Sequence, residues 1–207
     1  INPNVYGEYR YVVNYFLMVP GLIHLGYANS AGRLVAISKE NEQSKISGYA
    51  FTVCVLIASA YAIISTLIIS IMNTRGITNI SWFVVYLAPF TILSTMQLVV
   101  KNILTGQNKI YSLALFDLIP QLLFFIVVVF QVYAFDNISA SSLIIPYVVI
   151  NGLAIIYRVC KCSPVKVNVI RSLKALNEEN KRYGLKVYIG SVFGVVVGQV
   201  IGLVSCN

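Results

Sequence analysis

The charged residues of this sequence are separated by long stretches that contain no Asp, Glu, Lys or Arg. Such stretches lie at 46–74, 76–100, 137–157 and 187–207, while 11–32 is interrupted only by His24 and 110–135 only by Asp117. A helix needs roughly 20 apolar residues to cross a bilayer core about 30 Å thick. Six segments meet this requirement, so the sequence predicts an all-α integral membrane protein.

The composition of the chain agrees with this class. Charged residues make up 11% of the chain and hydrophobic residues 58%, whereas a soluble domain carries about 25% charged residues. This balance excludes a soluble catalytic domain. The predicted spans cover about 11–34, 48–72, 80–104, 110–134, 140–160 and 186–205.

Lysine and arginine lie almost entirely on one side of these spans. The first, third and fifth connections hold thirteen of the fifteen, and the other side has only Arg10 and Arg75. Because basic loops remain in the cytoplasm, the bias predicts a multi-pass protein of the cytoplasmic (inner) membrane with its basic loops facing the cytoplasm. The net charge of +8 follows from this arrangement, and we expect no nucleic-acid partner.

The longest polar connection is the segment 161–185. Val167, Ile170, Leu173 and Leu176 recur there at near-helical spacing among basic residues, which predicts an amphipathic helix on the inner membrane surface. The segment separates five spans from the sixth.

The two ends of the chain suggest a longer protein. The first residue is Ile1, no signal peptide precedes the first span, and the last span stops at Asn207 without a polar tail. The orientation drawn from the basic loops also places Ile1 outside the cell, which requires an earlier span. We therefore expect sequence before Ile1 and after Asn207.

Four short motifs follow one another along the chain. They are Asn2-Pro3-Asn4-Val5-Tyr6-Gly7-Glu8-Tyr9 before the first span, Leu25-Gly26-Tyr27-Ala28-Asn29-Ser30-Ala31-Gly32-Arg33 at its end, Leu104-Thr105-Gly106-Gln107-Asn108-Lys109-Ile110-Tyr111-Ser112 between the third and fourth spans, and Lys181-Arg182-Tyr183-Gly184-Leu185 before the sixth. Their order resembles that of the second to seventh helices of polysaccharide flippases. These are the O-antigen (Wzx-type) transporters of the multidrug/oligosaccharidyl-lipid/polysaccharide superfamily.

The resemblance covers essentially the whole chain and implies a MATE-like helical bundle. Residues 1–160 would form an incomplete N-terminal lobe, 161–185 a cytoplasmic linker, and 186–207 the first span of a C-terminal lobe. The implied function is the flipping of a polyprenyl-pyrophosphate-linked oligosaccharide, an O-antigen, capsule or exopolysaccharide repeat unit, by alternating access. It implies no enzymatic activity and no cofactor. The expected partners are the lipid bilayer, this substrate and other glycan-assembly membrane proteins.

Several polar residues lie on shared helical faces inside the spans, where polar groups are costly and usually face protein or water. We expect substrate contacts from Asn14, Gln97 and Asn151, and from the cations Arg33, Lys101 and Arg158, which could bind the pyrophosphate. The alternative for the cations is topological anchoring, because all three lie near span ends.

Two other residues are candidates for ion coupling. Asp117 lies roughly two turns inside a span, at a position where such transporters often have an uncharged polar residue. It either couples transport to an ion or pairs with a Tyr or Lys of a neighbouring helix. His24 is either a proton relay or a hydrogen-bonding partner between helices.

The last predicted span carries a ridge of glycines at steps of four, namely Gly190, Gly194, Gly198 and Gly202. Such a ridge permits close approach of another backbone, inside the bundle or in a dimer. Cys160 and Cys162 form a single C-x-C pair without a third Cys or a His nearby, which is a poor zinc site, so we expect no metal.

Other functions remain open at this point. A multidrug or small-solute antiporter of the same superfamily would favour acidic and aromatic residues over cations in its cavity. Part of a membrane-embedded glycan polymerase or acyltransferase would need paired catalytic residues or a sizeable loop. The single His, the lone intramembrane Asp and the short outer loops argue against that enzyme. A structural membrane scaffold is a further alternative.

Overall fold

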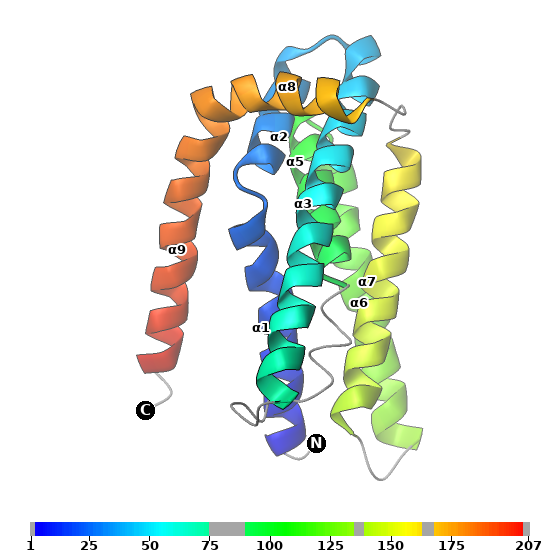
Figure 1. The fold of residues 1–207 in the computed structure, drawn as a ribbon. Coiled ribbons are helices and arrows are strands. Elements are labelled where there is room, and N and C mark those ends of the chain that lie inside the picture. Colours follow the sequence, from blue (N-terminus) through cyan, green and yellow to red (C-terminus); the bar gives the residue numbers. More distant parts are fainter. Residues whose placement is uncertain (1–2, 75–89, 135–138, 163–167, 205–207) are drawn as a thin grey trace.

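The structure, a computed structural model, describes residues 3–74, 90–134, 139–162 and 168–204, and these parts consist of helices without a strand (Figure 1). The helices are, in chain order, α1 (Pro3–Ile23), α2 (Tyr27–Ile37), α3 (Glu40–Thr74), α5 (Thr91–Gly106), α6 (Ile110–Ala134), α7 (Ala140–Lys161), α8 (Val169–Glu179), the π-helix η2 (Asn180–Gly184) and α9 (Leu185–Val204).

Three of the described helices are long and apolar enough to cross a membrane. They are α3 over Glu40–Ile68, α6 over Ile110–Ala134 and α7 over Ser141–Lys161. Helix α6 leaves most of its apolar side chains exposed, including Phe125 and Phe130, as expected of a helix that faces lipid. The predicted fold class, an all-α integral membrane bundle, is confirmed.

The bounds of the predicted spans agree best at α6 and α7. Helix α3 begins at Glu40, well before the predicted start at 48, because its polar first turns continue the helix out of the apolar stretch. Of the predicted span 80–104, the structure describes the part that forms α5, while residues 75–89 lie outside the described residues.

The structure divides the predicted span over 11–34 into two helices, α1 and α2. Leu25 has a φ of 47° and Gly26 a φ of 83°, and left-handed backbone at two successive residues ends α1 before α2 begins. Glycine adopts this conformation without the steric cost that other residues carry. A hydropathy pattern does not report backbone angles, and the break is as apolar as its surroundings.

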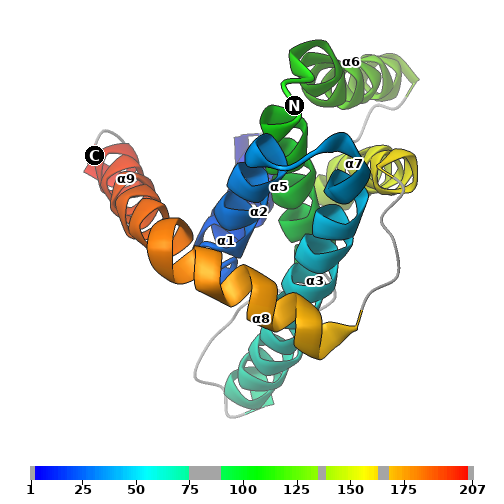
Figure 2. The same ribbon diagram turned by 90° about the horizontal axis from the view of Figure 1, so that it is seen from above.

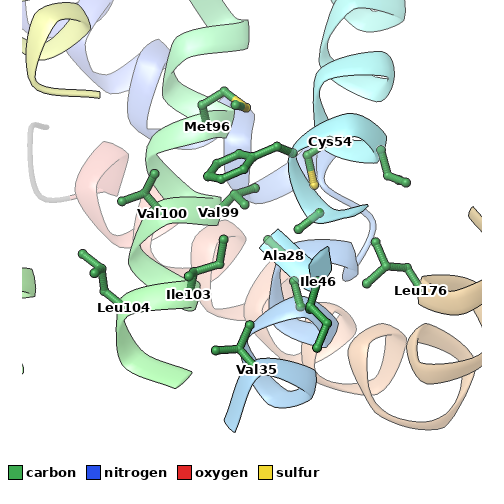
Figure 3. Packing of buried hydrophobic residues seen from close by; sticks show 14 of the residues in the cluster. Ala28, Val35, Ile46, Cys54, Met96, Val99, Val100, Ile103, Leu104 and Leu176 are labelled. Atoms are coloured by element: carbon green, nitrogen blue, oxygen red, sulfur yellow. The ribbon is translucent and has the colours of Figure 1, made fainter. Parts of the chain in front are cut away.

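The core lies where α2, α3 and α5 meet at the end of the bundle near α8. Ala28 and Val35 of α2 pack against Val99 and Ile103 of α5, with Leu176 of α8 closing the cluster (Figure 3). Gly32 of α2 and Gly106 of α5 let these two helices approach closely. A Cβ on Gly32 would lie 2.8 Å from the Asn102 carbonyl oxygen, and a Cβ on Gly106 would collide with the Gly32 carbonyl oxygen.

Helix α8 lies across one end of the bundle, between the end of α7 and the start of α9 (Figures 1 and 2). We call this the α8 end; α2, α5 and α7 finish there, and α3 and α6 begin there. Ser172 and Leu176 are buried, whereas Ile170 is 77% exposed. The helix thus has one face on the bundle and apolar side chains available to a membrane surface.

Candidate functional site

A small pocket with a mostly apolar lining and four polar side chains lies between α5 and α7 within the bundle. Ser94 and Gln97 of α5 line it together with Tyr147 and Asn151 of α7, and its volume is about 30 Å³. This is room for one or two water molecules. The Nδ2 group of Asn151 donates to the Tyr147 backbone carbonyl oxygen at 2.8 Å. The side-chain oxygen Oδ1 of Asn151 is then left to accept a hydrogen bond from a ligand.

The structure therefore brings together two of the polar residues that the sequence singled out, Gln97 and Asn151. The third, Asn14 of α1, has an exposed side chain and does not line this pocket. The aromatic rings of Tyr9 and Phe124 stack at 5.8 Å, and Tyr147 packs edge-on against both. These rings connect α1, α6 and α7 next to the pocket.

A larger polar cavity of about 630 Å³ opens at the α8 end. Its lining includes the cations Lys109, Arg158 and Lys161 and the single carboxylate of Glu40. Arg158 Nη2 donates to the Ser112 carbonyl oxygen at 3.2 Å, so it is held against the first turn of α6. Arg158 is the only one of the three predicted phosphate-binding cations that lines this cavity.

Cys162, just after α7, lines the same cavity. Burial raises the pKa of its thiol, while the nearby charges of Lys109 and Arg158 lower it, and burial has the larger effect. Cys162 is thus partly buried at this edge of the cavity.

Lys101 and Asp117 form an ion pair between α5 and α6. The Nζ atom lies 2.8 Å from Oδ1 of the carboxylate, and the side chains are 37% and 48% exposed. The pair gives the intramembrane carboxylate a cationic partner on a neighbouring helix, the second of the two arrangements considered above.

Arg33 lies on α2 near the junction of α8 and η2, where it meets two side chains. Its Nη1 is 3.1 Å from Oε1 of Glu179, and its guanidinium lies 4.6 Å from the Tyr183 ring centroid. Glu179 Oε1 has no hydrogen-bond partner among the described residues, so its contact with Arg33 is an ion pair without a well-directed hydrogen bond. Arg33 thus connects α2 to the segment that leads into α9.

His24 lies at the break between α1 and α2 and is buried. Its Nδ1 lies 2.9 Å from the Pro20 carbonyl oxygen, and since that oxygen only accepts, Nδ1 carries a proton. Nε2 is buried without a hydrogen-bond partner among the described residues, and the ring packs edge-on against Tyr188 of α9. The hydrogen bond that His24 makes is therefore to the backbone at the end of α1, beside the break.

Side chains of η2 and α9 bind the backbone groups that the break leaves free. Asn180 Nδ2 donates to the Leu25 carbonyl oxygen at 2.9 Å, and the Tyr188 hydroxyl donates to the Leu22 carbonyl oxygen at 2.7 Å. Ser30 donates to Asn180 Oδ1 at 3.1 Å. Buried backbone carbonyls need such partners, and in a membrane water cannot supply them.

The glycine ridge of α9 has no neighbour at its described positions. A Cβ on Gly190 or Gly194 would meet no atom within 4 Å, and the surroundings of Gly198 and Gly202 lie outside the described residues. The packing role of the ridge therefore remains a prediction.

Sequence reasoning missed the contacts that involve Glu179, Asn180 and Tyr188, and the gathering of Lys109 and Lys161 beside Arg158. The sequence places these charged residues near helix ends but does not show which residues they contact. Leu25-Gly26 was the one local signal for the break, because a glycine inside an apolar helical stretch often marks a break or a close approach. In the part of the chain that the structure describes, His, Cys, Asp and Glu form no group of three able to hold a metal ion.

Comparison with known proteins gives one family. The family model for polysaccharide biosynthesis proteins matches residues 1–205, nearly the whole chain. Comparisons with curated proteins and with solved structures gave no significant match. The length of the family match and the helical membrane architecture point to the same conclusion, and the chain belongs to the polysaccharide biosynthesis protein family, the family of the Wzx-type flippases.

Proposed function

We propose that this chain is part of a transporter that flips a polyprenyl-pyrophosphate-linked oligosaccharide across the cytoplasmic membrane. The observation that carries the proposal is the family match over residues 1–205. Members of this family are typically transporters rather than enzymes. The pocket between α5 and α7 adds the side chains of Ser94, Gln97, Tyr147 and Asn151 to an otherwise apolar lining.

The polar groups of this pocket are of the kind that binds a sugar. Because the pocket has room for only one or two water molecules in this structure, a sugar would bind here only after α5 and α7 have moved apart during transport. Gln97 and Asn151 each offer both a donor and an acceptor, and Ser94 and Tyr147 add hydroxyls, which are the groups that bind sugar hydroxyls.

The described helices α1 to α7 form one bundle, and α9 diverges from it (Figure 1). In alternating access, two halves rock about a central site, and we assign 1–160 to one half, 161–185 to the linker and 186–207 to the other.

The function can be tested in cells depleted of the protein. We expect the lipid-linked repeat unit to accumulate while the surface polysaccharide disappears, because synthesis on the inner face continues without export. An antiporter for small solutes would leave the polysaccharide unchanged. A polymerase subunit would leave single repeat units on the cell surface, and either result would reject the flippase.

We also propose that the α8 end faces the cytoplasm of the cell. The proposal rests on the thirteen basic residues of the three connections that lie on that side. In a background without native cysteines, Ser38→Cys and Lys174→Cys should react with a membrane-impermeant maleimide only after permeabilisation. Gly76→Cys and Asn137→Cys should react in intact cells. The reverse pattern would overturn the orientation.

A further inference from the structure

Two hollows meet at Arg158. One is the basic cavity of the α8 end described above. The other is an apolar groove of about 250 Å³ between α6 and α7, lined among others by Leu123, Leu153, Ala154 and Tyr157. Arg158 lines both, so the same residue borders an apolar groove and a polar, positively charged cavity.

The groove opens on the apolar outer surface of the bundle. Leu153 is 63% exposed, Tyr157 60% and Leu123 48%, and these side chains belong to the helices most suited to crossing the bilayer. The groove also differs in position from the pocket between α5 and α7. Tyr147 and Asn151 face that pocket, whereas Leu153 and Tyr157 lie on another side of the same helix.

The basic cavity has positive charge that the described carboxylates do not balance. It contains three cations and one carboxylate, Glu40, and the ion pairs found among the described residues involve Arg33 and Lys101 instead. Lys109, Arg158 and Lys161 thus form a cationic cluster at a helix-bundle end. Gln107 and Ser44 line the same space and supply further hydrogen-bonding groups.

We propose that the groove and the cavity together bind an anionic phospholipid of the surrounding leaflet. One acyl chain lies in the groove between α6 and α7, and the phosphate lies beside Arg158, Lys109 and Lys161. Arginine suits a phosphate because it offers parallel N–H donors, and basic pockets between membrane helices attract anionic headgroups. The bound lipid would connect the ends of α3, α5, α6 and α7.

The commitment to a phospholipid follows from the position of the groove. Its walls are exposed on the lipid-facing flank, so the bilayer lipids reach it directly and at high concentration. The polar residues suited to a sugar lie on the other side, between α5 and α7. The proposal is therefore independent of the flippase function, and a polyprenyl phosphate in the same groove is a competing outcome of the test.

The experiment is native mass spectrometry of the full-length protein, purified in detergent and delipidated. The probes are dioleoyl phosphatidylglycerol, dioleoyl phosphatidylcholine and undecaprenyl phosphate. We expect one phosphatidylglycerol to be retained in preference to phosphatidylcholine. Arg158→Gln should weaken that binding about tenfold, the effect of losing one hydrogen-bonded charge contact, and Ala154→Phe should weaken it by filling the groove. Lys174→Gln, the same charge change on the exposed face of α8, should leave it unchanged.

The proposal fails if phosphatidylcholine is retained as well as phosphatidylglycerol, or if Arg158→Gln and Ala154→Phe bind like the wild type. Preferential retention of undecaprenyl phosphate would also overturn it and would assign the groove to the carrier lipid. Should Arg158→Gln not fold, Lys109→Gln and Lys161→Gln, at exposed positions, serve in its place. A double variant that binds phosphatidylglycerol normally would then reject the site.

Discussion

Replacing Gly26 by alanine is expected to destabilise the protein by about 2–5 kcal/mol, the sum of a left-handed backbone penalty and the cost of overpacking. Gly26 has a φ of 83°, and a Cβ there would lie 2.5 Å from the backbone carbon of Gly184 and 2.6 Å from Asn180 Oδ1. The break between α1 and α2 and the π-helix η2 thus meet backbone to backbone. The measurement is the unfolding midpoint of the purified protein in detergent.

The matched control is Gly7→Ala in α1, where an added Cβ would meet nothing within 4 Å. We expect it to unfold like the wild type. Gly184→Ala separates the two causes of the Gly26 effect, because its backbone is helical and only the crowding against Gly26 and Ser30 remains. Gly184→Ala as stable as Gly7→Ala would show that the two segments do not touch, and Gly26→Ala equally stable would contradict the left-handed backbone as well.

The second large effect is expected at the ion pair between Lys101 and Asp117. Lys101→Asp alone and Asp117→Lys alone should each lower the amount of membrane-inserted protein severalfold, because each places two like charges together in a membrane bundle. The double exchange, Lys101→Asp with Asp117→Lys, should recover most of the protein. The measurement is protein level in the membrane together with surface polysaccharide.

Polysaccharide export by the double exchange decides the role of Asp117. If the pair only joins α5 to α6, export recovers with the protein level. If the carboxylate carries the coupling ion, protein recovers and export does not, since the carboxylate then lies on the wrong helix. Failure of the double exchange to recover any protein would contradict the pairing.

The helices that the sequence predicted best were those whose apolar stretches end at charged or turn-forming residues. Helix α6 runs from Ile110 to Ala134 and α7 from Ala140 to Lys161, because hydrophobicity and length alone decide such spans. The break at Leu25 and Gly26 could not be found in this way. It depends on two backbone angles and on partners from η2 and α9, which lie far away in the sequence.

The residues of the candidate site were likewise predicted only in part from the sequence. Gln97 and Asn151 lie on helical faces that the sequence could identify, and the structure brings those faces to one pocket. The cations could be placed near helix ends but not assigned partners. Arg33 meets Glu179 and Lys101 meets Asp117, whereas Arg158 joins two lysines around a cavity. Which cation is paired depends on how the helices pack, and a single sequence does not contain that directly.

The most direct test of the account is a flipping assay with the full-length protein in liposomes. A fluorescent polyprenyl-pyrophosphate-linked oligosaccharide is incorporated, and its exposure on the outer leaflet is followed by quenching with a membrane-impermeant reagent. We expect the protein to speed the appearance of the lipid on the opposite leaflet, and Gln97→Leu with Asn151→Leu to abolish this at normal stability. Movement of the lipid at the protein-free rate, with folded protein in the liposomes, would contradict the proposed function.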